Sequence, residues 1–105
     1  MKVINDPDVD EFILSLQAPA KSKVMRMIEL LENFGHQIGS PYSKKVADGL
    51  FELRIRGTQE VRIFYAFHQN AAYLLHGFVK KSQKIPPNEL KKAIRNKSLL
   101  TGYNQ

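Results

Sequence analysis

The hydrophobic positions of the chain follow two periods, which divide it into a helical first part and a strand-rich second part. Asp6 and Pro7 form a helix start signal, and apolar residues at helical spacing follow them until Pro19. A second helix is predicted over residues 20–34, because apolar residues recur there at positions i, i+3, i+4 and i+7 before Gly35. The short link between the two segments predicts an antiparallel helical hairpin.

The apolar period changes from about 3.6 to 2 after residue 49. Residues 50–56, 61–67 and 73–80 alternate in polarity, and the segments between them have the length of hairpin turns. This pattern predicts an antiparallel meander with one continuous apolar face, which the helical hairpin is expected to cover. Residues 36–49 are expected to form a loop, and residues 1–5 a short edge strand.

A last helix is predicted from Pro86 to about Lys97, with Leu90, Ala93 and Ile94 facing inward. The sequence therefore predicts an α+β fold and a single domain over residues 1–105. An N-terminal helical hairpin packs on one face of a small, mainly antiparallel, twisted sheet, and a C-terminal helix follows.

Composition adds little, but the distribution of charge is informative. The 105 residues are 43% hydrophobic and 25% charged, and they include no cysteine, which excludes a disulfide scaffold, a thiol nucleophile and a cysteine-ligated metal site. No apolar run is long enough to span a bilayer, so a cytoplasmic protein is expected.

The net charge is +6, and residues 44–105 carry twelve Lys and Arg against four Asp and Glu. A positive half of this kind favours a polyanionic partner, nucleic acid first, although an acidic protein also fits.

The strand period also predicts which side chains share the second face of the sheet. Three-residue turns at 57–59 and 69–71 would place Arg54 opposite Arg62 and Phe64 opposite His76. In this register Leu74 shares the face of His76, and Leu75 lies on the apolar face. Like charges that face each other across strands are destabilising, so Arg54 and Arg62 are either neutralised, with Glu52 as the nearest acid, or used to bind an anion.

This predicted face has the residue types that single-stranded RNA requires. Phe64 and Phe78 alternate with cationic side chains, and bases stack on rings while cations bind phosphates. RNA cleavage by its own 2′-hydroxyl needs a base, a proton donor and cations at the phosphate. His76 can titrate near neutral pH, and the sequence has no metal-ligand or cofactor motif, so no metal and no cofactor are expected.

Three segments in a fixed order resemble the core motifs of a known family. They are GLFELR at 49–54, VRIFY at 61–65 and LLHGFVKKSQKIP at 74–86. The chain resembles the RelE/ParE toxin superfamily in its phage-type HigB-like branch, over roughly residues 9–97.

The resemblance implies a RelE-like fold and the toxin of a type II toxin–antitoxin system, a ribosome-dependent mRNA interferase that needs no metal. It implies that Arg62 stabilises the scissile phosphate and that Glu52 orients Arg62. The other catalytic candidates are Arg54, Lys80, His76 and Lys81, and Tyr103 in the tail is a further candidate base. The remaining candidates for RNA binding are Lys44, Lys45, Arg56, Phe64, Phe78 and Lys84.

The resemblance also implies partners. The cognate antitoxin is expected to be a helix-turn-helix HigA-like protein or a small acidic protein from the adjacent gene, with operator DNA bound only through the antitoxin complex. The ribosome and mRNA are the expected targets, and no membrane is involved. Two alternatives stay open, namely a ParE-like inhibitor of DNA gyrase that is not an enzyme, and an inactive homologue that binds the antitoxin.

Overall fold

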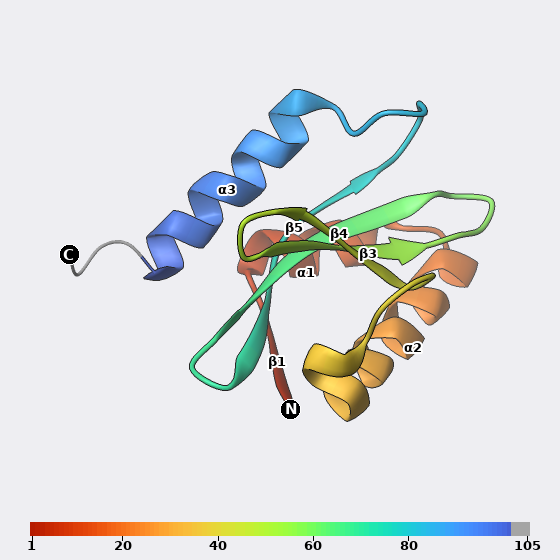
Figure 1. The fold of residues 1–105 in the computed structure, drawn as a ribbon. Coiled ribbons are helices and arrows are strands. Elements are labelled where there is room, and N and C mark those ends of the chain that lie inside the picture. Colours follow the sequence, from red (N-terminus) through yellow and green to blue (C-terminus); the bar gives the residue numbers. More distant parts are fainter. Residues whose placement is uncertain (102–105) are drawn as a thin grey trace.

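A five-stranded sheet lies between two helical layers, with a helical hairpin on one face and a single helix on the other (Figure 1). The computed structural model describes residues 1–101. Its elements are β1 (Lys2–Asn5), α1 (Pro7–Ser15), α2 (Ala18–Phe34), the short 3-10 helix η1 (Gly35–Gln37), β2 (Ser43–Ala47), β3 (Leu50–Ile55), β4 (Val61–His68), β5 (Ala71–Val79) and α3 (Pro87–Thr101). The predicted α+β architecture is confirmed.

The helical hairpin begins and ends as the sequence signals require. The Asp6 side chain accepts a hydrogen bond from the Asp8 backbone N–H at 2.9 Å, and Pro7 occupies the first turn of α1. Helix α2 begins at Ala18, two residues earlier than expected, because Pro19 is compatible with a first helical turn. Gly35 ends α2 with φ +51, a conformation that glycine adopts without a steric penalty.

The strands follow the order β1-β5-β4-β3-β2, with β1 parallel to β5 and the other pairs antiparallel. The expectation that residues 36–49 are all loop is wrong, because residues 43–47 form the edge strand β2 against β3. This strand has two adjacent lysines in place of a clean alternation, so it lacks the usual pattern of a strand.

Strand β5 has a β-bulge that the sequence analysis missed. Gln69 and Asn70 have φ values of +50 and +62, as the two-residue hairpin turn requires, so the predicted three-residue turn at 69–71 is wrong. The register then shifts between Phe64 and Tyr65. On the side of the bulge away from the turn, Phe64 pairs with His76 as predicted. At the bulge and toward the turn the prediction is reversed, because Leu74 packs with the helical hairpin and Leu75 lies on the other face.

Each face of the sheet carries its own apolar cluster. The hairpin packs on one cluster with Val24, Leu31, Leu53, Ile63 and Leu74 among its buried members. Helix α3 packs on the other cluster, which contains Leu50, Phe64, Ala66, Leu75, Phe78 and Ala93. The second face of the sheet is therefore partly covered by α3, and Ile94 is 47% exposed instead of facing inward as expected.

Candidate functional site

The polar residues of β3 and β4 lie on the sheet face that α3 partly covers. Arg54 pairs with Arg62 and Glu52 pairs with Phe64, as the strand period predicted. Glu52 and Arg62 are each 2% exposed, and about a quarter of the Arg54 side chain is exposed. Charged residues are almost never this buried unless they are paired, so the contacts within this cluster have to account for their burial.

The carboxylate of Glu52 lies between two guanidinium groups. Its Oε1 is 3.5 Å from Arg54 Nε, and its Oε2 is 3.5 Å from Arg62 Nε. Glu52 is two residues before Arg54 on one strand and diagonal to Arg62 on the next, so the period of the sheet brings all three together. These contacts fit the orienting role expected of Glu52, and they reduce the repulsion between the two arginines.

Glu60 contacts the outer end of the Arg62 guanidinium. Arg62 Nη1 donates to Glu60 Oε2 and to the Val61 carbonyl, both at 3.1 Å, and Arg56 Nη1 lies 3.8 Å from the same carboxylate oxygen. Burial raises the pKa of Glu60, but the hydrogen bonds from Arg62 and the Gly57 backbone and the charges of Arg62 and Arg56 outweigh it. The net pKa of Glu60 is lowered, so this side chain is ionised at neutral pH.

Glu60 is a site residue that the sequence analysis missed. A signal for it was present, because Glu60 is two residues before Arg62, and extended backbone places both side chains on one face. Its position in the connection between β3 and β4 hid this relation.

Some buried polar atoms at the centre of this cluster make no hydrogen bond. Within the described residues, Arg54 Nε, Arg62 Nε and Glu52 Oε2 are buried polar atoms with no hydrogen-bond partner. Buried polar groups are nearly always satisfied, and each exception calls for an explanation. The contacts of Glu52 with the two Nε atoms at 3.5 Å are therefore ion pairs without a hydrogen bond.

A cleft of about 440 Å³ opens beside this cluster, where β4 begins and β5 ends. Its lining residues are Arg56, Glu60, Arg62, Lys80, Lys81, Ser82 and Gln83. The Lys80 backbone N–H donates to the Glu60 carbonyl at 2.6 Å, which fixes the start of the lysine-containing loop against the β3–β4 connection. Four cationic side chains and one carboxylate line the cleft, so it is suited to a phosphate or another anion.

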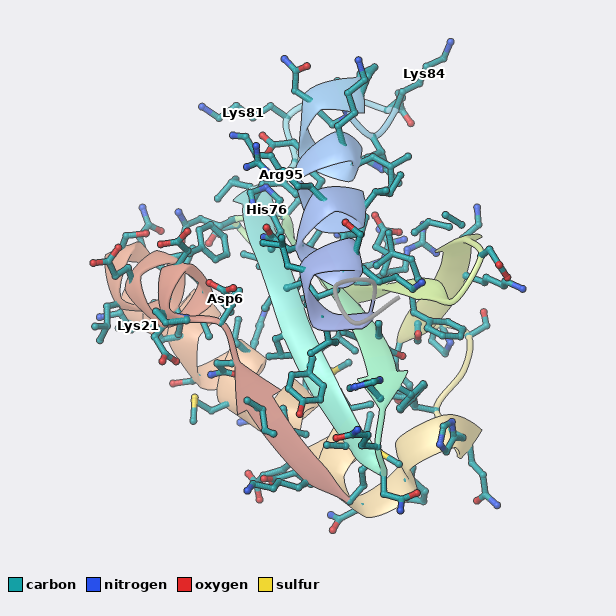
Figure 2. The ribbon with its side chains drawn as sticks, turned by 90° about the vertical axis from the view of Figure 1, so that its left-hand side faces the viewer. Asp6, Lys21, His76, Lys81, Lys84 and Arg95 are labelled. Carbon is teal, nitrogen blue, oxygen red and sulfur yellow. The ribbon has the colours of Figure 1, made fainter. Side chains whose placement is uncertain are left out.

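The three lysines expected to bind RNA lie outside this cleft. Lys44 and Lys45 are on the edge strand β2, where only Lys44 shares the face of its partner Glu52, since consecutive strand residues point to opposite faces. Lys84 is exposed, and Figure 2 shows it on the opposite side of α3 from Lys81.

The expected stacking of RNA bases on Phe64 and Phe78 is not compatible with this structure. The two side chains are 0% and 6% exposed because α3 packs over them with Ala93 and Leu90. Their ring centroids are 5.6 Å apart, and both belong to the core between the sheet and α3. Burial, which a strand pattern alone does not predict, overturns this expectation.

His76 lies in a different cleft from Arg62. Its Nε2 is 2.6 Å from Oε1 of Glu89 in α3, and it lines a cleft of about 260 Å³ with Asp8, Lys92 and Arg95. Figure 2 shows His76 next to Arg95 of α3. The structure therefore does not bring His76 to the Arg62 cleft as a base. Tyr103, the other candidate base, lies outside the described residues.

Two features of the described residues bear on the remaining classes of function. Residues 1–101 contain no group of three His, Cys, Asp or Glu side chains placed to hold a metal ion. Over the same part of the chain, every helix is too short or too polar to cross a membrane.

Comparison with known proteins identifies similar sequences. Residues 11–98 match the family described as "Phage derived protein Gp49-like (DUF891)". The chain is 39% identical over 83 residues to a Mycobacterium tuberculosis protein named "Putative toxin HigB3", an alignment that covers 73% of this chain and 72% of that protein. The family match, over residues 11–98, includes Glu52, Arg54 and all the residues that line the cleft.

Proposed function

The chain belongs to the phage-derived Gp49-like family, in the HigB-like branch of the RelE/ParE toxins, and from this we propose that it is the toxin of a toxin–antitoxin pair that cleaves mRNA on the ribosome. Family membership supports the assignment of this chain as a toxin. The chemistry of the Arg62 cleft supports the choice of a phosphodiester as the target.

One observation carries the proposal. The Arg62 side chain is only 3% exposed, yet it lines an open cleft whose other cations are Arg56, Lys80 and Lys81. A cation held in place by surrounding protein needs no reorganisation when charge develops on a bound group, and this is the largest single contribution to many enzymatic rate enhancements. Surface lysines alone would bind RNA without this fixed geometry.

The proposed reaction assigns roles to Arg62, Lys80 and Lys81 and to two carboxylates beside Arg62. The 2′-hydroxyl of one nucleotide attacks the adjacent phosphorus and gives its proton to solvent water, and the bond from phosphorus to the 5′-oxygen breaks as that oxygen takes up a proton. Arg62 stabilises the charge on the phosphate oxygens, and Lys80 and Lys81 bind the phosphate and supply the proton to the leaving oxygen. Glu52 and Glu60 are positioning residues, because each acts through the Arg62 guanidinium.

The proposal includes partners and a location. The antitoxin is a helix-turn-helix or small acidic protein that covers part of the basic surface, and the complex of the two binds operator DNA through the antitoxin. Activity on translating ribosomes places the protein in the cytoplasm. A gyrase inhibitor built on the same fold would have no need for a buried arginine in a cleft lined by further cations.

The test is to map transcript ends in a reconstituted translation reaction that contains the purified chain. Cuts are expected inside translated reading frames. Lys80→Ala or Lys81→Ala should reduce the cleavage rate by about 10- to 100-fold, since each removes a charged contact worth roughly 1.5–3 kcal/mol.

Lys2→Ala is the matched control. Lys2 is an exposed lysine on β1 beside Ala71, at the opposite end of β5 from the cleft, so its loss should leave cleavage unchanged. Intact transcripts together with gyrase-dependent DNA breaks would reject the proposal in favour of the ParE-like alternative.

A further inference from the structure

A second hollow lies next to the Arg62 cleft, where α2 approaches the end of β3. It has a volume of about 310 Å³, and we call it the α2–β3 groove. Its lining residues are Lys23, Arg26, Met27, Pro41, Tyr42, Arg54, Ile55 and Arg56.

The groove exists because the edge strand is shorter than its neighbour. Strand β2 begins at Ser43, and the last backbone contact before it is the hydrogen bond from Arg54 N to the Tyr42 carbonyl at 2.8 Å. The preceding residues turn away, with Tyr42 N donating to the Gly39 carbonyl. On this side of Ile55 and Arg56, α2 is the next element, and Lys23 Nζ donates to the Arg56 carbonyl at 3.0 Å.

The groove combines an apolar interior with cations around it. Met27 and Ile55 belong to the hydrophobic core at its base, and the Tyr42 side chain is 47% exposed. Four of the eight lining residues are Lys or Arg, and none of the eight is acidic. The matching ligand has a flat, weakly polar body and negative charge at its edge, which is the chemistry of a nucleotide.

The groove adjoins the Arg62 cleft. Arg56 lines both hollows, and Arg54 of the groove is paired directly with Arg62 of the cleft. Side chains paired across antiparallel strands start only about 5 Å apart, so a chain of nucleotides bound in one hollow extends naturally into the other.

We propose that the α2–β3 groove binds the base of a nucleotide next to the scissile phosphate and so gives the cleavage site its base preference. Tyr42 stacks on the base, and Arg54 and Arg56 bind the phosphates on either side of it. This inference rests on the proposed function, because it takes RNA as the substrate of the neighbouring cleft.

An acidic peptide would also satisfy the cations, but the shape favours a nucleotide. The volume is at the lower end of the range for small-molecule sites, which suits one ring-bearing unit. Peptides usually add a strand to a sheet edge or lay a helix in a long groove. Here the α2 side chains Lys23, Arg26 and Met27 occupy the side from which a strand would add.

The direct test is a titration of the full isotope-labelled chain followed by backbone amide NMR signals. The four nucleoside 3′-monophosphates are compared with ribose 5-phosphate and inorganic phosphate at one ionic strength. The nucleotides should shift the amide signals of Gly39, Ser40, Tyr42 and residues 54–56. The two ligands without a base should bind at least about 10-fold more weakly, since stacking on an aromatic ring contributes roughly 1–3 kcal/mol.

Variants of Tyr42 isolate the contribution of the ring. Tyr42→Ala should abolish the preference for base-containing ligands, and Tyr42→Phe should keep it. Phe34→Ala is the matched control, because Phe34 is also an exposed aromatic residue, 53% exposed, but lies at the far end of α2. Equal binding of nucleotides and inorganic phosphate would overturn the inference, as would signals that respond to an acidic peptide and not to nucleotides.

Cleavage mapping separates this inference from the proposed function. Tyr42→Ala should flatten the base preference next to the cut while the chain still cleaves. Cleavage with an unchanged preference and no groove signals overturns the inference and leaves the proposed function standing. Intact mRNA with Tyr42-dependent nucleotide binding refutes the proposed function and supports the groove as a nucleotide site.

Discussion

Arg62 is both a buried structural residue and the proposed phosphate ligand. Its guanidinium contacts the carboxylates of Glu52 and Glu60, and the buried position holds it at the wall of the cleft. Removing one partner of a buried ion pair leaves the other charge uncompensated, which costs far more than the pair itself contributes. Mutation of Arg62 therefore affects the fold as well as the chemistry.

We expect Arg62→Ala to lower the free energy of unfolding by about 3–5 kcal/mol, because it leaves Glu52 buried beside Arg54 alone. Adding Glu52→Gln to Arg62→Ala should recover part of this loss, since the stranded charge is then absent. Chemical denaturation of the wild type, both single variants and the double variant measures the coupling. A change within about 0.5 kcal/mol for Arg62→Ala would show that the pair has no structural role.

The strand period predicted which residues meet in this cluster, but it could not predict their burial. Two-residue alternation placed Glu52, Arg54 and Arg62 on one face, and the structure confirms that placement. How exposed a face is depends on what packs on it, and the sequence pattern did not show which face α3 would cover. For the same reason Phe64 and Phe78 were expected to be accessible to RNA, although α3 covers both of them.

At the scale of elements, the turn between β4 and β5 shows how two local features can offset each other. A two-residue turn gives the hairpin an odd register, and the bulge at Leu75 restores the even register that the three-residue turn had predicted. The pairs next to the Arg62 cleft were therefore predicted correctly from a wrong turn. Leu74 and Leu75, between turn and bulge, were assigned to the wrong faces.

Gly77 sets the distance between β5 and α1. A Cβ atom at this position would lie 2.5 Å from Cδ2 of Phe12, and the ring is held against the sheet by the hairpin. We expect Gly77→Ala to destabilise the chain by roughly 1–3 kcal/mol through overpacking, measured by chemical denaturation.

Gly39→Ala is the control, because a Cβ at Gly39 meets no atom within 4 Å. In a Phe12→Ala background the cost of Gly77→Ala should shrink, since the clashing ring is gone. Equal costs for Gly77→Ala and Gly39→Ala would mean that the α1–β5 distance adapts freely.

At the scale of the whole molecule, charge and layering together define the working surface. The positive half of the sequence folds into the sheet and α3, while the hairpin contributes Lys23 and Arg26 to the α2–β3 groove. The composition predicted a polyanionic partner. It could not predict the groove, because Lys23 and Tyr42 are far apart in sequence and meet only through the packing of α2 beside β3.

We expect binding to ribosomes or single-stranded RNA to weaken steeply with salt. If the cations of the cleft and the groove together neutralise about four phosphates of a single strand, the slope of log K against log salt concentration is about −3, and Lys81→Ala should make it shallower by up to about 0.7. Affinity measured over a series of salt concentrations gives the slope. A flat dependence would mean that these side chains are not the contact surface.

The margin of the sheet at β2 has a consequence for self-association. This strand is hydrogen-bonded to β3 on one side, and within residues 1–101 no other strand pairs with it. An open margin invites a second copy to extend the sheet, but adjacent lysines at 44 and 45 would then face the like charges of the incoming copy. Repulsion between these lysines would therefore oppose polymerisation through β2, in addition to any contact that they make with RNA.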